Sequence, residues 1–587
     1  HADVVALGIA TAAQLAGMGD DPALVWLRGA VAENVGVACG LMGRHSEAMA
    51  HYEQARLAYD EVGASDDVAR SLANRGCELV DLGRAGEAMA AFDQARAMFV
   101  ECDERLWVAK VDAHRGQAEL ARGHLGAAVE LLEAARRDLD ALDAVAERRR
   151  ATAVLVAAYT ELRLIDEARA AADVLVDELR RSQLPHDLGA ALVARGRALL
   201  VDGRLDAARR DIDEAIALLD EVGDRGGAAS AWTVLARIDA AAGDVAGARA
   251  AARRAADVAL ELDREADHLT AATLAAELLV PRDPSRALDD ARGLRPRGEA
   301  SGLPLVLARI DYVIGIAAAA VGDDAAAERS LSEAIARVTR LHEALDSDEW
   351  RMRFLHDRRE MHESFADVLL NAGRAGDALE VLDQPRRLLA GPASEHGSEL
   401  AASIDALGRA SSADRPGLVE RVRALEAAAR RVDGPERRSA VGGRAPVGRT
   451  AVVYRVRDDS VGAFVVAGAA TVWVPLCVTT DVRRAVQRLE ANWRHRRMLG
   501  AAHESRLADE LLALLQHLYS AIVEPLLPWL SDEVDVVSDG IVHGVPLAAL
   551  HDGTEHLVSR LVIRDVGSLM AGPMPPWVQR TSAVAIG

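Results

Sequence analysis

The chain has 587 residues, which is too long for one hydrophobic core and fits either several domains or an array of repeats. Half of the residues are hydrophobic but only 3% are aromatic, and the formal net charge is -22. Such an acidic chain argues against a binder of duplex nucleic acid that relies on overall charge. No uncharged apolar run reaches the roughly 18 residues of a membrane helix, so no membrane partner is expected. The four cysteines lack metal-type spacing and fit a reducing cytoplasm.

The first predicted element is a helix over Val4 to Leu15. In the register of the repeats that follow, it is the second helix of a helical hairpin, with Gly8 at a small-residue position. A solenoid that began on half a repeat would expose the apolar face of that helix. We therefore expect further sequence upstream of His1.

From Asn34 onward, a pattern of small and apolar residues returns every 40 residues. The segment from Asn34 to Ala55 recurs at Asn74 to Ala95 and at His114 to Ala135. Glycines mark this period, and they are Gly36, Gly76 and Gly116 at one position and Gly43, Gly83 and Gly123 at another. A fixed period of this length is typical of an α-solenoid.

The offsets within one unit resemble the tetratricopeptide repeat, whose usual period is about 34. The first glycine lets the first helix (A) approach the second (B), and the other ends helix A with a positive φ. Tyr52 and its equivalents are expected to fill the space between repeats. That family commonly ends helix B with a proline, but this chain has Asp60 instead, so helix B is expected to run on for a turn or more. HEAT repeats share the longer period but not this residue order.

Prolines indicate where the array is distorted and where it ends. Pro281, Pro284 and Pro296 predict a distorted seventh unit or a bend. Pro385 stands inside the last predicted helix B, which it should kink or shorten. The solenoid is therefore assigned to residues 1–390. Residues 391–448 are rich in Pro, Gly, Ser and Arg and are predicted to be a linker with one helix over Leu418–Val432.

At the start of residues 449–587, hydrophobic residues recur with the two-residue period of strands. Further along, predicted strands alternate with helices, which favours an α/β sheet. The predicted strands are Ala451–Val456, Val461–Ala467, Ala470–Leu476, Val534–Val537, Val558–Val566 and Ser582–Ile586, with helices over Asp481–Arg496 and His503–Leu530. The first three strands should form an antiparallel meander. The predicted fold is mainly α: a right-handed tetratricopeptide-type solenoid followed by a partial α/β domain.

The order of motifs in this last region resembles the CHAT family of caspase-like peptidase domains, which are found downstream of such repeats. The matching motifs are the repeat at Phe365–Leu389, Glu524-Pro525-Leu526, Asp539-Gly540, Pro546, Ala549-Leu550 and Asp552-Gly553. The resemblance implies a Cys-His dyad on strands that follow the one beginning at Ser582. Neither residue lies in this sequence, so no catalytic residue is assigned, and the domain is expected to continue beyond Gly587.

Cys477 and His543 are candidates for a catalytic dyad. The simpler interpretation, a strand-end cysteine and a loop histidine, is favoured. His543, His551 and His556 lack the spacing of a metal site on a helix. No metal and no cofactor are therefore expected.

A second candidate site lies on helix A of the repeats. Asn34 and Asn74 hold equivalent positions that face the concave groove in similar repeats, where an amide can pair with an extended peptide. Basic residues recur in rows, and they are Arg70, Lys110 and Arg150 in one and Arg197 and Arg237 in the other. A basic row in an acidic chain favours an acidic peptide or protein partner. The alternative is that these residues pair with acids on neighbouring helices.

Together these features predict a cytoplasmic, caspase-like cysteine endopeptidase of the tetratricopeptide-CHAT type, whose repeats bind a protein partner and regulate proteolysis of a protein substrate. The resemblance implies bacterial defence or regulated cell death. The present chain would lack the dyad, and it would be an enzyme only as part of a longer protein that supplies the His and Cys. The alternatives are a non-catalytic interaction scaffold with a degenerate peptidase domain, and a repeat-containing transcriptional regulator. No helix-turn-helix with a basic recognition helix supports the latter.

Overall fold

The computed structural model describes residues 2–19, 21–345, 347, 350–351, 353–354, 358–389, 449–498 and 504–565. The predicted linker helix and the strand predicted over Ser582–Ile586 lie outside these residues. The chain divides into two compact units, His1–Met361 and His362–Gly587, which are described separately. The sequence instead suggested a boundary at residue 390, and that assignment stays a prediction.

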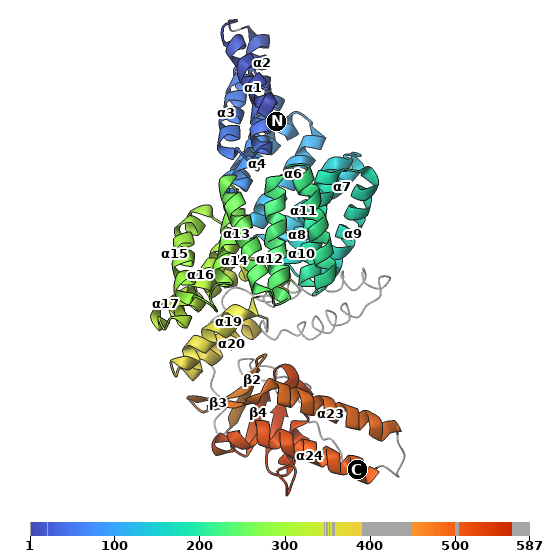
Figure 1. Cartoon of the computed structure of the whole chain (residues 1–587), viewed down its shortest axis with the longest axis vertical. Helices are drawn as coiled ribbons and strands as arrows, with labels where there is room; N and C mark the ends of the chain where they lie inside the picture. Colours follow the sequence, from blue (N-terminus) through green and yellow to red (C-terminus); the bar gives the residue numbers. More distant parts are fainter. Residues whose placement is uncertain are drawn as a thin grey trace. The chain divides into compact units, whose positions relative to one another are not determined.

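The first unit is a series of antiparallel helical hairpins (Figure 1). Its helices are α1 (Ala2–Ala16), α2 (Pro22–Leu41), α3 (His45–Glu61), α4 (Ser65–Asp81), α5 (Ala85–Glu101), α6 (Arg105–Ala121), α7 (Leu125–Ala141), α8 (Val145–Glu161), α9 (Ile165–Ser182), α10 (Pro185–Val201), α11 (Leu205–Glu221), α12 (Arg225–Ala241), α13 (Val245–Glu261), α14 (Glu265–Glu277), α15 (Pro284–Ser301), α16 (Pro304–Ala320) and α17 (Asp324–Glu343). The even-numbered helices are the A helices and the odd-numbered ones are the B helices. The predicted tetratricopeptide-like solenoid is confirmed.

The 40-residue period consists of two equal halves. Helices α4 and α5 each have 17 residues and are separated by residues 82–84. Helix B ends at Glu61, one residue after Asp60, so the expected extension by a turn or more is wrong, and helix A is just as long. The extra length relative to the usual repeat is thus not confined to helix B.

From α2 to α14, every turn between helices places one residue in the left-handed region, at intervals of 20 residues. These residues are Gly43, Gly63, Gly83, Asp103, Gly123, Asp143, Arg163, Gln183, Gly203, Gly223, Gly243 and Asp263. The hydrogen bonds are those of a Schellman motif, in which Arg84 N donates to Leu79 O and Gly83 N donates to Val80 O. The sequence indicated only the turn after helix A, because four of these six turns after helix B use aspartate or glutamine instead of glycine.

Close packing of helix A on helix B explains the small residue that recurs at Gly36 and its equivalent positions. A Cβ on Gly36 would lie 2.8 Å from Cε1 of Tyr52, and Gly76 stands in the same way against Phe92. Both aromatic rings are buried. The aromatic residue therefore packs on the small residue of its own repeat, and Phe92 also stacks on His114 of the next repeat, as expected of a side chain that fills the space between repeats.

The two ends of the array follow the sequence with small differences. The predicted N-terminal helix is α1, which packs against α2. Helix α2 is long and apolar enough to cross a membrane by length and composition alone, but it includes Arg28 and the buried Glu33 and packs as an A helix of the solenoid. In the seventh unit, α14 is shortened to 13 residues, so the predicted distortion is confirmed.

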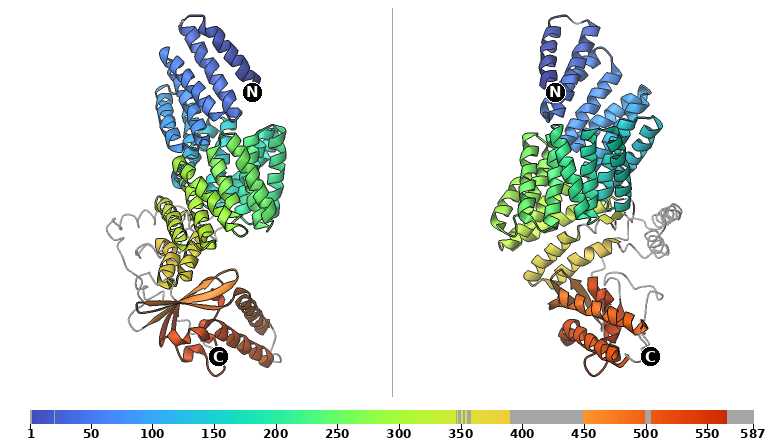
Figure 2. Two further views of the ribbon diagram at one scale, coloured as in Figure 1. Left: turned by 60° about the vertical axis from the view of Figure 1, so that its left-hand side comes forward. Right: turned by 45° about the vertical axis from the view of Figure 1, so that its right-hand side comes forward.

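The solenoid curves so that the A helices lie on the inside. Consecutive A helices such as α8, α10 and α12 contact one another, whereas consecutive B helices within the described residues have few such contacts. The curve closes on itself, because the turn at Gly43 lies against Leu262 and the turn at Gly83 lies against Leu303. Figure 2 shows the green helices returning to the blue ones. We call these contacts between early and late repeats the seam.

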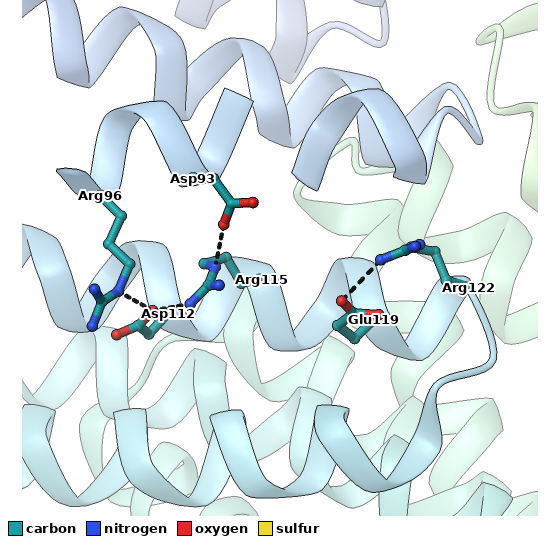
Figure 3. Close-up of polar contacts among 6 residues, drawn as sticks. All are labelled: Asp93, Arg96, Asp112, Arg115, Glu119 and Arg122. Atoms are coloured by element: carbon teal, nitrogen blue, oxygen red, sulfur yellow. Dashed lines mark hydrogen bonds and ion pairs between the residues drawn. The ribbon is translucent and has the colours of Figure 1, made fainter. Parts of the chain in front are cut away.

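Ion pairs join several B helices to the next A helix, and some of them recur at equivalent positions of the array. Arg115 Nε lies 3.0 Å from Asp93 Oδ1, and the same guanidinium group bonds Asp112 at 2.9 Å (Figure 3). The equivalent pairs in other repeats are Arg75 with Glu53 and Arg195 with Asp173. Each such exposed pair stabilises the fold by about 0–1 kcal/mol, so they align the repeats more than they hold them together.

The second unit contains a five-stranded mixed sheet. Its strands are β1 (Thr450–Val456), β2 (Ser460–Ala467), β3 (Ala470–Val478), β4 (Glu533–Val537) and β5 (Val562–Asp565), in the spatial order β3-β2-β1-β4-β5. Strands β1 to β3 form the predicted antiparallel meander, and β1, β4 and β5 are parallel. Helices α23 (Thr479–Met498) and α24 (Glu504–Ile522) pack their apolar side chains against the sheet.

A helical hairpin, α19 (Arg359–Asn371) and α20 (Ala375–Leu389), packs against the same sheet. The side chain of Arg455 on β1 is buried and bonds Asp367 Oδ1 at 2.9 Å and the Glu363 carbonyl oxygen at 3.0 Å. This buried pair explains why the last repeat-like hairpin clusters with the sheet. Helix α20 has 15 residues, compared with 17 in α5, and it includes Pro385, so the expected kink or shortening at that proline stays a prediction.

Two elements of the second unit differ from their predicted bounds. Helix α24 ends at Ile522, and a short 3₁₀ helix over Glu524–Trp529 follows it because Pro525 and Pro528 remove backbone donors. The predicted strand over Val558–Val566 is restricted to β5, because Leu557–Ser559 form a 3₁₀ turn instead.

The left-handed turns predict opposite effects for two glycine substitutions. Gly223 has a φ of +74° with open space around it, and Gly293 lies inside α15 with open space around it. Gly223→Ala should lower the free energy of unfolding by about 1 kcal/mol through left-handed strain, whereas Gly293→Ala should raise it by about 1 kcal/mol through helix propensity. Urea unfolding followed by helical circular dichroism measures both, and shifts of the same sign would contradict this account.

Candidate functional site on the inner helix face

The inside of the solenoid presents two rows of side chains from the A helices. We call these two rows the inner face. The first row consists of Arg70, Lys110, Arg150 and Arg309, and the second of Arg197, Arg237 and Glu277. Arg237 indicates the geometry, since its side chain is exposed and yet burial lowers its pKa. This combination fits a side chain that faces solvent from inside a concavity.

Charges from several A helices converge on Arg237. After burial, the neighbouring Arg197 lowers its pKa further, and Arg309 acts in the same direction, while Glu161 and Glu277 oppose them. These groups come from α8, α10, α14 and α16, which lie far apart in sequence. The curvature of the solenoid therefore focuses positive charge at the centre of an otherwise acidic chain.

Two residues of the predicted basic rows are already paired. Arg70 forms an ion pair with Asp67 on its own helix. Lys110 Nζ lies 3.6 Å from Glu147 Oε1 and 3.8 Å from the centroid of the Trp107 ring. For these two residues the structure shows the alternative anticipated from the sequence, pairing with nearby groups.

The other three predicted basic residues have no such partner. Within the described part of the chain, Arg150, Arg197 and Arg237 make no ion pair and no hydrogen bond. Arg150 and Arg237 are exposed, and Arg197 is half-buried. The structure thus divides the sequence-based set into occupied and available guanidinium groups.

Sequence analysis missed Arg309, although it occupies the same repeat position as Arg70, Lys110 and Arg150. Each of them stands six residues before the small-residue position, which is Gly315 in this unit. The distorted seventh unit shifts the register by one residue, and this concealed the match. Arg309 Nε lies 2.9 Å from Glu277 Oε2, and Glu360 also binds its guanidinium group. It is therefore occupied.

A neutral histidine lies beside the unpaired Arg150. Burial lowers the pKa of His114 to about 4, and the charges of Lys110 and Arg150 add to this effect. The imidazole stacks on Phe92 with ring centroids 5.8 Å apart. At neutral pH, His114 therefore contributes a polar but uncharged group to the inner face.

The two predicted asparagines have different surroundings despite their equivalent positions. Asn34 is exposed, and its Nδ2 donates to the Ala30 carbonyl oxygen of its own helix at 2.8 Å. Asn74 is half-buried and donates to Glu33 Oε1 at 2.5 Å. Their amide nitrogens are thus engaged within the solenoid, and their role in peptide binding stays a prediction.

In the second unit, the surroundings of Cys477 and of the three histidines His543, His551 and His556 do not favour reactivity. Burial raises the pKa of the Cys477 thiol to about 11, and Asp481 adds to the shift, so the nucleophilic thiolate is disfavoured. His543 is exposed on a 3₁₀ turn. His551 and His556 lie edge to edge, and His556 Nδ1 bonds the Ala549 carbonyl oxygen.

Comparisons with known proteins give similarities to helical-repeat structures. No protein-family model matches the sequence, and no curated protein matches it. Among solved structures, a Rap protein complexed with competence and sporulation factor is 11% identical, with 62% of this chain and 98% of that chain covered and a TM-score of 0.47. The STAND protein PH0952 from Pyrococcus horikoshii, which has a tetratricopeptide repeat sensor, is 14% identical over 59% of this chain and 54% of that one, with a TM-score of 0.33.

BtubC from P. vanneervenii is a third such structure, with 19% identity, coverage of 38% of this chain and 91% of that chain, and a TM-score of 0.32. Similarities this distant concern the fold alone. The helical hairpins described above define the class of this chain, a tetratricopeptide-like solenoid protein with an additional α/β unit.

The His114 environment predicts a measurable titration. The pKa in the folded state lies below the value of about 6.5 expected in the unfolded state, so the neutral form is favoured by folding. This contribution to stability is complete above pH 6.5 and is lost as the pH falls towards 4. NMR titration should give His114 a pKa of about 4, and Arg150→Ala should raise it while burial keeps it below 6.5. A normal pKa in the wild-type chain would contradict the described packing.

Proposed function

We propose that the solenoid binds an extended, acidic protein segment along its inner face. The observation that supports this proposal is the set of unpaired guanidinium groups of Arg150, Arg197 and Arg237 inside a concavity. Many other arginines of the array have carboxylates in contact, as Arg195 does with Asp211. A cation that is partly removed from water without a counter-charge costs free energy, which an incoming carboxylate would offset.

The overall charge of the chain does not oppose such a partner at short range. Although the net charge is -22, charges separated by more than about 8–10 Å are largely screened at physiological ionic strength. An acidic segment that reaches the centre of the inner face would meet Arg197 and Arg237 first. The planar guanidinium group can bind a carboxylate through two parallel hydrogen bonds, which favours acidic side chains over other acceptors.

Binding of a fluorescein-labelled dodecapeptide of alternating Glu and Ala tests this function by fluorescence anisotropy. Replacing both Arg197 and Arg237 with Ala should raise the Kd at least tenfold, because two available cations are lost. Arg70→Ala is the matched control on the same face, and it should change the Kd less than about threefold because Asp67 already occupies that group. Equal losses in both proteins, or equal binding of a Lys-Ala peptide, would refute the proposal.

We further propose that the second unit is the N-terminal part of a caspase-like peptidase domain that the solenoid regulates in the cytoplasm, with bacterial defence or regulated cell death as the setting. The support is the resemblance of residues 449–587 to the CHAT family together with the mixed sheet, in which an antiparallel meander precedes parallel strands. The strands that would bear the dyad lie beyond the described residues. A scaffold with a degenerate peptidase domain is the remaining alternative.

A chain that continues beyond Gly587 decides between peptidase and scaffold. We expect a His and a Cys, each at the end of an apolar strand, and cleavage of a co-encoded protein that is lost when that Cys is replaced by Ala. Cys477→Ala is the control, and it should keep full cleavage because its thiol is held protonated by burial. Absence of the two residues, or cleavage that survives the replacement, would reject the peptidase and leave the scaffold.

A further inference from the structure

Two repeat positions that are apolar elsewhere are occupied by polar groups in the first two hairpins. At the position of His45, the later repeats have Ala85, Leu125, Ile165, Leu205 and Val245. At the position of Glu78, the other repeats have Ala38, Ala118, Ala158, Ala198 and Ile238, all of them buried. A carboxylate in such a core position is costly unless something compensates it.

The two exceptional side chains meet each other between hairpins. His45 is the first residue of α3 and is 2% exposed, while Glu78 lies in the last turn of α4 and is 8% exposed. His45 Nδ1 lies 2.7 Å from Glu78 Oε2. Asp81, three residues further along α4, brings a second carboxylate, and one donor atom from each residue lies within 4.8 Å of the others.

A third exception in the register makes room for this cluster. Gly40 on α2 stands where other repeats have Val80, Leu120, Thr160, Leu200 and Ala240. A Cβ on Gly40 would overlap Oε1 of Glu78. The first hairpin therefore leaves a space that the Glu78 carboxylate fills, and three departures from the repeat pattern coincide at one point.

The polar groups of the cluster are not satisfied by the protein alone. His45 Nε2 is buried and has no hydrogen-bond partner. Glu33 provides a contrast, since it is equally buried but accepts hydrogen bonds from Ser71 and Asn74. Burial raises the pKa of Glu78, and His45 and the guanidinium group of Arg264, which also interacts with Asp81, oppose this rise.

We propose that His45, Glu78 and Asp81 bind a divalent transition-metal ion of the Zn²⁺ type, which ties the second hairpin to the first. One imidazole nitrogen and two carboxylate oxygens on two helices suit zinc better than magnesium or calcium, which prefer sets of oxygen ligands. Ligand atoms around a tetrahedral ion with bonds of about 2.0–2.2 Å lie about 3.4 Å apart, so His45 and Glu78 would move apart and the widest pair of the cluster would move closer. Water would complete the coordination. The ion takes the place of the hydrogen bond between His45 and Glu78 and binds the lone pair of an unprotonated ring nitrogen.

Titration of the chelator-treated full chain with Zn²⁺ in a calorimeter tests the site. We expect one equivalent to bind and to raise the midpoint of thermal unfolding. His45→Ala and Asp81→Asn should each weaken binding at least tenfold and remove the thermal shift. Co²⁺ substitution should give visible absorption without a thiolate charge-transfer band.

A matched control lies two repeats further along the array. His124 Nδ1 lies 2.6 Å from Glu119 Oε2 without a second carboxylate in the cluster and with a half-exposed ring. His124→Ala should bind Zn²⁺ as the wild type does. Asp81→Asn keeps the size of a half-buried side chain, so it tests the site even if His45→Ala does not fold. The proposal would be overturned if the wild-type chain did not bind one equivalent of Zn²⁺, or if Asp81→Asn bound Zn²⁺ as the wild type does.

Discussion

The left-handed residue that recurs every 20 residues is the constraint on which the solenoid depends. Each one ends a helix in a Schellman motif and fixes how the next helix leaves the turn. Because both kinds of turn use the same geometry, small rotations between hairpins accumulate in one direction. The curvature, the convergence of the A helices and the seam between early and late repeats all follow from this repetition.

Curvature also turns an ordinary charge pattern into a specific one. Along the sequence, the basic residues of the A helices are outnumbered by acids, and many of them are paired. On the inside of the curve, groups from α8, α10, α12, α14 and α16 approach each other, and Arg237 responds with a lowered pKa. The same residues on a straight array would be isolated surface arginines with little influence on one another.

The second unit follows different physics from the repeats. Its central strand β1 is buried on both faces, by α23 and α24 on one side and by the α19–α20 hairpin on the other. The buried Arg455 is tolerated because Asp367 and a backbone carbonyl satisfy it. A hairpin with repeat-like sequence has thus become part of the environment of a sheet.

The sequence by itself determined the repeat, its period, the packing glycines and the meander, because these depend on local backbone preferences and on the spacing of apolar residues. It also singled out all three unpaired arginines, but it could not separate them from Arg70 and Lys110, whose partners are fixed by rotamer and curvature. It missed Arg309, because one deleted residue in the seventh unit concealed its register. Only the tertiary structure showed which charges converge and that His45 meets Glu78, because these contacts join residues that are distant along the chain.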